Sequence, residues 1–120
     1  MTWAVKVEET LEQFQIDNSI PYDFERFDCD ADQLPDTFIV YFLVDDIGKT
    51  WADGKETSRE PRIQISLFYR DKKTALTIPD KIEAAFMAAN FMRVGGGRIP
   101  YQESTGHHGW RCDFRLYERR

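Results

Sequence analysis

Two strongly β-forming runs, separated by a long polar connection, constrain the fold of this chain more than any other feature of its sequence. The first run, residues 38–46, is apolar at almost every position, which is typical of a strand covered on both faces. The second run, residues 62–70, alternates, and its apolar face carries Ile63, Ile65, Leu67 and Tyr69. The two runs therefore predict neighbouring, paired strands of one sheet.

The connection at about residues 46–61 is too polar to bury. It is also too long for a minimal hairpin, in which about two to five residues are enough. We therefore expect a long protruding loop at this position. Its two glycines, Gly48 and Gly54, loosen the backbone, and its charged residues are of both signs. The length of this loop indicates a purpose beyond closing the turn.

The length and net charge of the chain limit the number of domains it can form and the kinds of partner it can bind. At 120 residues it is most simply a single domain, residues 1–120, and nine Phe with three Trp supply enough apolar surface for a core. The formal net charge of −5 argues against binding of nucleic acid through phosphate neutralisation, which requires a basic face. Four arginines near the C-terminus are expected on a solvated strand face rather than in a binding site: Arg111, Arg115, Arg119 and Arg120.

Cysteine usage and the N-terminal sequence bear on location. Cys29 and Cys112 are far apart and form no C-x-x-C pair, and no segment approaches the length of a membrane span. Acidic residues occur where a signal peptide requires an apolar stretch. We therefore expect a cytosolic protein with free thiols, although a single disulfide stays open from the sequence.

Two segments have the periodicity of helices. The first is expected to follow an N-cap at Thr2 and to end near Asp17, and its buried stripe is Trp3, Val7, Leu11 and Phe14. The second is expected from about residue 79 to residue 92, with Pro79 in its first turn and the glycines at 95–97 as its stop. Its buried stripe is Ile82, Ala85, Phe86 and Ala89.

The other sides of the second helix are unusually apolar for a surface helix. Met87 and Phe91 lie there, and they indicate either a second contact surface or a helix sunk between the sheet and its loops. Both alternatives remain open at the level of the sequence.

Three further segments predict strands. A short edge strand is expected around Tyr22 to Phe27, and a closing hairpin is expected from residues 98–104 and 109–118 with a turn at 105–109. In its last strand, alternate side chains are expected to point toward the core: Trp110, Cys112, Phe114 and Leu116. The side chains between them are expected to point outward: Arg111, Asp113, Arg115 and Tyr117. The fold class that follows is α+β: a single antiparallel sheet of about four to five strands flanked by two helices, in the order α-β-β-β-α-β-β.

Three groups of residues could carry chemistry. The spacing of Asp28, Asp30 and Asp32 is that of the start of a calcium loop, but Gln33 and Ile39 replace the glycine and the glutamate that such a loop requires. These aspartates are more simply an acidic solvated turn.

His107, His108 and Cys112 are the other candidates. Adjacent histidines on an extended backbone point to opposite sides, so capping of a turn is the simpler interpretation than metal binding. Strand alternation directs Cys112 toward the core, where a thiol is inert. We therefore expect no catalytic, metal-binding or cofactor-binding residues.

Several motifs in order along the chain resemble those of the tail-completion proteins of long-tailed phages and prophages, the family of tail terminators and head-to-tail joining proteins. These motifs are PDTFIVYFLVDD, WADGKETSREPRIQISLFYR, IPDKIEAAFMAANF and TGHHGWRCDFRLYE. The resemblance covers nearly the whole chain, and none of its motifs is a catalytic signature.

The resemblance implies a non-enzymatic virion protein that caps the tail tube as a ring, commonly a hexamer, and joins the tail to the head connector protein. Its expected partners are other copies of itself, the tail tube protein and the head connector protein. DNA would pass through without sequence-specific binding, and an acidic surface suits this passage. The expected location is the bacterial host cytoplasm during assembly and then the tail or neck of the virion.

The family supplies no catalytic residues, so the site residues proposed from the sequence are interface candidates. Those in the expected loop are Trp51, Asp53, Lys55, Glu56, Arg59 and Glu60, and those on the second helix are Met87 and Phe91. Two alternatives to the ring remain open: a monomeric adaptor that binds one partner protein, and a small metal- or thiol-dependent enzyme.

Overall fold

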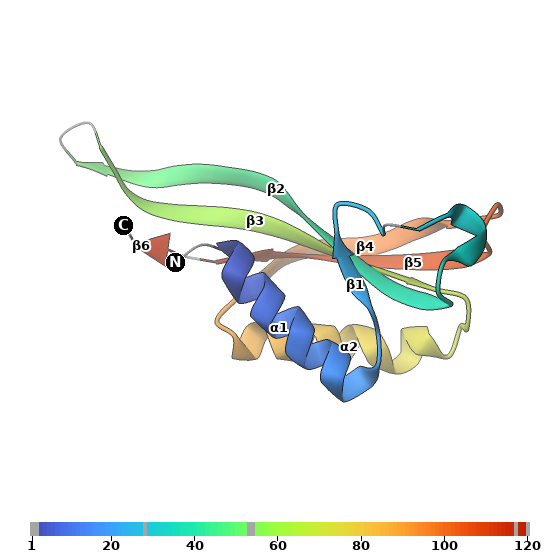
Figure 1. The fold of residues 1–120 in the computed structure, drawn as a ribbon. Helices are drawn as coiled ribbons and strands as arrows, with labels where there is room; N and C mark the ends of the chain where they lie inside the picture. Colours follow the sequence, from blue (N-terminus) through green and yellow to red (C-terminus); the bar gives the residue numbers. More distant parts are fainter. Residues whose placement is uncertain (1–2, 28, 53–54, 117, 120) are drawn as a thin grey trace.

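The computed structural model describes residues 3–27, 29–52, 55–116 and 118–119, and for residues 31, 45–52, 55–60 and 118–119 it describes the backbone alone. The helices are α1 (Trp3–Asn18), the short 3-10 helix η1 (Ala31–Gln33) and α2 (Thr74–Ala88). The strands are β1 (Tyr22–Phe24), β2 (Thr37–Ala52), β3 (Lys55–Tyr69), β4 (Met92–Gln102), β5 (His107–Arg115) and β6 (Glu118–Arg119). This order confirms the expected α+β fold (Figure 1).

The strands form one sheet in the order β1-β2-β3-β5-β4, and β6 pairs with β3 off this path. All of these pairs are antiparallel except β1 with β2, in which Tyr22 lies opposite Ile39 and Phe24 lies opposite Tyr41. The expectation of a purely antiparallel sheet was therefore wrong. The segment between β1 and β2, which includes η1, returns the chain so that both strands run in the same direction.

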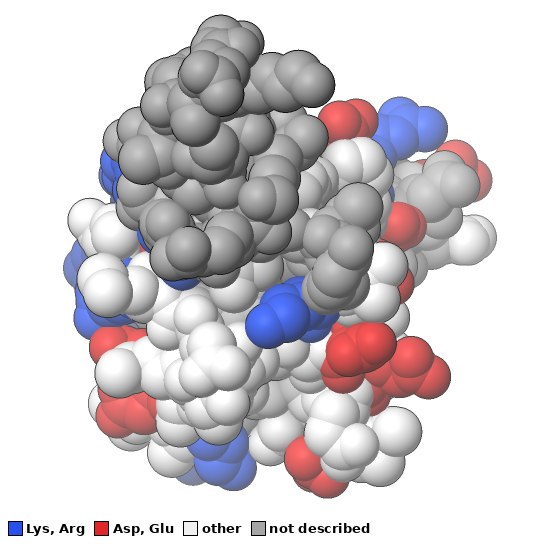
Figure 2. Space-filling view, turned by 90° about the vertical axis from the view of Figure 1, so that its left-hand side faces the viewer, with Lys and Arg blue, Asp and Glu red and all other residues white. Residues whose placement is uncertain are grey.

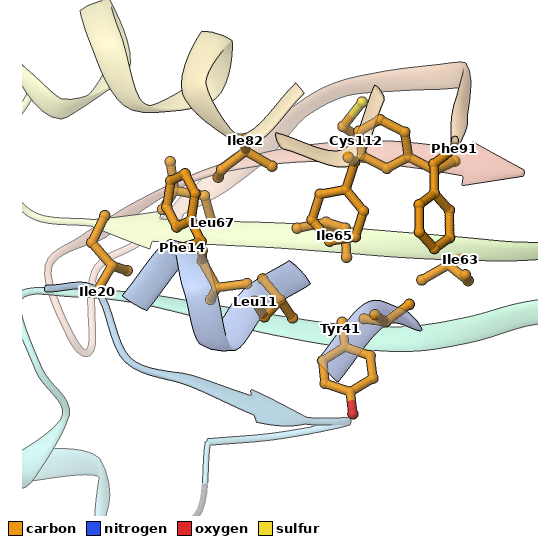
Figure 3. Close-up of a cluster of buried hydrophobic side chains, with 14 of the residues drawn as sticks. Leu11, Phe14, Ile20, Tyr41, Ile63, Ile65, Leu67, Ile82, Phe91 and Cys112 are labelled. Atoms are coloured by element: carbon orange, nitrogen blue, oxygen red, sulfur yellow. The ribbon is translucent and has the colours of Figure 1, made fainter. Parts of the chain in front are cut away.

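Both helices cover the same face of the sheet (Figure 1), and the core lies between them and the strands (Figure 3). The buried stripe of α1 is Val7, Leu11 and Phe14, and α2 contributes Ile82 and Phe86. From the sheet the core receives chiefly Ile39, Tyr41, Ile63, Ile65, Leu67, Cys112 and Phe114. The helical stripes expected from the sequence are confirmed, with Trp3, Ala85 and Ala89 partly buried against the same cluster.

The expectation of a protruding loop at residues 46–61 was wrong. Strands β2 and β3 instead continue as a paired ribbon, from Asp46 opposite Pro61 to Ala52 opposite Lys55, and β6 pairs with the β3 side of this ribbon at Ser58 and Arg59. Polar residues suit such a ribbon, because its backbone groups pair between the strands while its side chains need no core. In Figure 1 the ribbon extends beyond the layer of helices.

A sequence signal for this ribbon was present. The dipeptide Asp53-Gly54, which itself lies outside the described residues, separates the two paired strand ends. Asp-Gly between two strands is a strong signal for a two-residue hairpin turn.

Helix α2 begins at Thr74, five residues before the expected start at Pro79, so Pro79 lies inside the helix. The Asp71 side chain accepts a hydrogen bond from the Lys73 backbone N–H at 3.0 Å, which helps to start the chain turning. Proline removes only the hydrogen bond to the Ala75 carbonyl, and Ala75 is exposed to water. A proline near the helix start is therefore tolerated without ending the helix.

Helix α2 ends through Asn90 and not through the glycines at 95–97. Asn90 has a φ of 71°, and the N–H of Phe91 donates to the Phe86 carbonyl at 3.0 Å. The Phe91 ring then packs against the Phe86 ring with centroids 5.2 Å apart. This is the helix-ending motif in which a left-handed residue is followed by an apolar contact, and asparagine tolerates that conformation.

The glycines at 95–97 lie within β4, which begins at Met92 instead of at residue 98. A Cβ atom at Gly96 would lie 2.7 Å from the Arg111 carbonyl oxygen. Glycine is therefore required there by the close approach of β5 and not by a helix stop.

The closing hairpin turns at residues 103–106, where Gly106 has a φ of 77°, and not at 105–109. Cys112, Phe114 and Leu116 are buried and Trp110 is partly buried, as expected. Asp113 was expected on a solvated face, yet it is only 3% exposed. Tyr117 lies outside the described residues.

Candidate functional site

The face of the sheet that turns away from both helices carries the most distinctive arrangement of side chains. Successive residues of a strand point to opposite faces of the sheet. The residues that alternate with the core residues along β2, β3 and β5 therefore point to this face. We call it the helix-free face and define it by Phe38, Val40, Phe42, Arg62, Gln64, Ser66, Phe68, His107, Arg111, Asp113 and Arg115. It has an aromatic part on β2 and the end of β3, and a polar part on β3 and β5.

The aromatic part surrounds a hollow of about 340 Å³. Phe38 is central to it, because its ring stacks on Phe68 at 5.2 Å and contacts Phe27 at 5.0 Å. Phe27, Phe42 and Phe68 are only half-buried, and Glu25 and Arg26 stand among the residues that line the hollow. The hollow therefore offers apolar walls with charged groups of both signs beside them.

His107 closes this hollow and joins two distant segments. Its Nε2–H donates to the Pro35 carbonyl oxygen at 2.8 Å, its ring meets Phe38 edge-on, and the residue is 1% exposed. His108 points to the other face, with its ring 5.7 Å from that of Tyr69 and 4.7 Å from that of Tyr101. The two histidines do point to opposite sides, but they lie in β5 and do not cap a turn.

In the polar part, Asp113 is held by arginine side chains. Its Oδ2 accepts hydrogen bonds from Arg62 Nη2 at 2.9 Å and from Arg62 Nε at 3.2 Å. Its Oδ1 is buried and accepts no hydrogen bond, although Arg111 Nη1 lies 3.5 Å away. At this distance the Arg111 guanidinium attracts the carboxylate electrostatically, but the two groups form no hydrogen bond. The negative charge on this buried oxygen of Asp113 is therefore only partly compensated.

The interface candidates of residues 51–60 lie on the ribbon and not on a loop. Trp51 is in β2, Asp53 lies outside the described residues, and the remaining four are in β3: Lys55, Glu56, Arg59 and Glu60. Pairing places Trp51 opposite Glu56 and Arg59 opposite Gly48. The ribbon thus brings the candidates together on one projecting element.

The two candidates on α2 differ from each other. Met87 is 55% exposed and is available for contact, whereas Phe91 is 3% exposed and packs on Phe86 and Phe114. Phe91 is therefore a core residue, and its assignment as a surface candidate was wrong. The ring was expected on the outer side of α2, but the turn at Asn90 directs it back into the core.

The candidates for chemistry are dispersed. Burial raises the pKa of the Cys112 thiol to about 11, while Cys29 is exposed, and both are free cysteines. Asp30 precedes η1, and Asp28 is outside the described residues. Within the described ranges, no three His, Cys, Asp or Glu side chains are grouped so that they could hold a metal ion. None of the helices in those ranges is long and apolar enough to cross a membrane.

A cluster that no sequence pattern indicates joins α1 to the sheet. Glu8 accepts hydrogen bonds from Tyr22 and from Tyr41, which lie in β1 and β2. Burial, followed by the contact with Glu8, raises the pKa of Tyr22 to about 12, and the same causes raise the pKa of Tyr41. The cluster therefore favours neutral tyrosines that donate to one carboxylate.

Comparison with known proteins identifies no relative: no model of a protein family matches the chain, and no curated protein is similar to it in sequence.

Proposed function

We propose that this chain is a structural phage or prophage virion protein that caps the tail tube as a ring and joins the tail to the head connector. The observation that carries the proposal is the β2–β3 ribbon, which extends past the helices. Only the two-residue strand β6 adds to this ribbon among the described residues, and the helices do not extend over it. A ribbon of two strands is at best marginally stable in water by itself. Such an element gains most when a neighbouring subunit or partner protein covers it.

The composition of the ribbon supports a repeated protein contact. Its sequence contains charged residues of both signs and one tryptophan, Trp51. An isolated surface ion pair contributes only about 0–1 kcal/mol, but an aromatic anchor supplies much of the binding energy of an interface while charges set its register. In a ring, each contact is repeated at every subunit boundary. The net charge of −5 also disfavours trapping of DNA that passes through the ring.

The ring proposal is tested by measuring mass in solution, for the chain alone and with tail tube protein. The expected result is a closed ring on the end of the tube, with head joining at normal yield. Trp51→Ala is expected to abolish tail completion without unfolding the subunit. The matched control is Leu76→Ala, which removes a 76% exposed residue of α2 away from the ribbon and is expected to cap tails normally.

Two results would contradict the proposal. One is a wild-type chain that stays monomeric in the presence of tail tube protein, which would favour the monomeric adaptor. The other is a Trp51→Ala variant that caps tails and joins heads at normal yield, which would place the interface away from the ribbon.

A further inference from the structure

The outward side of α1 carries a stripe that the core does not explain. Val5, Glu9, Glu12 and Ile16 are spaced so that they share the side of the helix opposite Val7, Leu11 and Phe14. Val5 is 47% exposed and Ile16 is 70% exposed, so each end of this stripe presents a bare aliphatic side chain. We call these four residues the α1 outer stripe.

The α1 outer stripe is also acidic. The helix carries four carboxylates but one lysine, namely Glu8, Glu9, Glu12 and Asp17 against Lys6. Glu8 is engaged by Tyr22 and Tyr41, whereas Glu9 and Glu12 are exposed on the outer stripe. The stripe therefore consists of two carboxylates between two aliphatic residues.

The helix-free face has the complementary chemistry. Among the described side chains of its polar part, two arginines, Arg62 and Arg111, lie against the single carboxylate of the buried Asp113. Arg62 and Arg111 both lie against that carboxylate and still have side chains 32% and 40% exposed. A chain with a net charge of −5 thus has a locally basic region, which adjoins the aromatic hollow around Phe38 and Phe68.

The spacing of apolar and charged groups on the two surfaces is similar. On α1, Ile16 and Glu12 are about 6 Å apart along the helix axis, at about 1.5 Å per residue. On the sheet, Arg111 lies opposite Ser66 on the neighbouring strand, two residues along from Phe68, so Arg111 and Phe68 are offset by about 7 Å along the strands and about 5 Å across them. A helix laid on the sheet can therefore place Ile16 at the hollow while Glu12 and Glu9 reach the arginines.

We propose that the α1 outer stripe of one subunit docks on the helix-free face of the next, with Ile16 at the aromatic hollow and Glu12 beside Arg111. The occupant is a second copy because both complementary surfaces belong to one chain and lie on opposite sides of it. A contact between different surfaces of identical subunits is head-to-tail, and it generates a ring when the rotation closes. The inference rests on the proposed function and names the faces that meet in the ring, in addition to the ribbon.

A protein partner suits this surface better than a nucleic acid. Phosphate-driven binding requires an extended basic region. Figure 2 views the molecule from the end at which the ribbon lies, and there the acidic and basic side chains of the described residues are interspersed. The hollow beside the arginines also has apolar walls. An acidic helix with aliphatic ends matches both features.

The test exchanges the charges at the inferred contact. Glu12→Arg and Arg111→Glu are each expected to lower the association constant for ring formation at least tenfold, and the double variant is expected to restore it. Ile16→Asp, at a 70% exposed position, is expected to lose ring formation while keeping the wild-type melting temperature. The matched control is Glu103→Arg, an exposed position in the turn between β4 and β5, which is expected to assemble normally. The readout is native mass and sedimentation with tail tube protein.

The outcomes separate the inference from the proposed function. A wild-type chain that forms no ring contradicts both. A wild-type ring with normal assembly of Glu12→Arg and Ile16→Asp overturns the docking inference alone, as does a double variant that stays as defective as its parents. Binding of duplex DNA that Arg111→Glu abolishes while rings form normally would assign the helix-free face to DNA instead.

Discussion

The Arg62 guanidinium lies 2.9 Å from the Asp113 carboxylate and joins neighbouring strands β3 and β5 on the face that the helices leave open. The carboxylate is buried to 4% side-chain exposure, whereas the arginine is 32% exposed. A Cβ atom at Gly95, opposite Asp113, would lie 3.3 Å from Arg62 Nη2. A side chain at Gly95 would therefore require the Arg62 guanidinium to shift by a few tenths of an ångström.

Asp113→Ala is expected to lower the free energy of unfolding by about 2–3 kcal/mol, because the variant loses hydrogen bonds to a charged donor at a buried position. Urea denaturation measures the loss. Asp36→Ala is the matched control: Asp36 pairs with Arg70 at 2.7 Å, but its side chain is 81% exposed. That exposed pair is expected to contribute less than about 1 kcal/mol. Equal losses in the two variants would show that burial does not strengthen the Arg62 pair.

Phe86→Ala is expected to cost about 3–5 kcal/mol, because Phe86 is 1% exposed and its ring stacks on Phe114 at 5.0 Å. Denaturant melts measure this cost. Met87→Ala, at the next and 55% exposed position of α2, is the control and is expected to change stability by less than about 0.5 kcal/mol. A loss below about 1 kcal/mol for Phe86→Ala would contradict the packing of α2 on the sheet.

His107→Gln is expected to lower stability by about 1–2 kcal/mol, because it disturbs the buried hydrogen bond to the Pro35 carbonyl. His108→Gln is the comparison and is expected to cost less, because His108 is only partly buried. The absence of a metal role for either residue stays a prediction. It is checked by adding zinc and measuring the melting temperature, which a metal site would raise in the wild type alone.

The two cysteines are expected to react at very different rates. A thiol reagent at neutral pH should modify Cys29, which is exposed, and should reach Cys112 only after denaturation. Counting modified thiols by mass spectrometry checks this expectation. Rapid modification of Cys112 in the native protein would support the thiol enzyme that the sequence left open.

Burial of Cys112 also predicts a pH dependence of stability. Burial raises the pKa of this thiol from 9.0 to about 11, so the folded chain holds the proton more tightly than the unfolded chain does. The stabilising contribution is therefore fully present below pH 9 and is lost as the pH rises toward 11. Unfolding free energies of the wild type and Cys112→Ala, compared across this window, should converge as the pH rises. A constant difference would mean that the thiol does not titrate in this range.

The sequence by itself determined the elements whose signal is local. Two periodic patterns are of this kind: the helical stripe of Val7, Leu11 and Phe14, and the strand alternation of Ile63, Ile65 and Leu67. Each pattern specifies which side chains of the element must be buried, whatever the position of that element in the fold. These patterns predicted two helices, the central pair of strands and the inward face of β5. The Asp53-Gly54 dipeptide was also a local signal, and the length of the polar connection concealed its meaning.

The tertiary structure alone decided what depends on neighbours distant in the chain. Asp113 is buried because Arg62, 51 residues away, compensates its charge, and His107 is buried because it can donate to Pro35, 72 residues away. Alternation cannot separate a solvated position from one covered by a distant partner, so Asp113 was expected in solvent. His107 was expected in a turn, because its distant partner Pro35 could not be recognised from the sequence. The same reason explains why the helix-free face was not foreseen: a hollow and a basic region exist only once β2, β3 and β5 lie side by side.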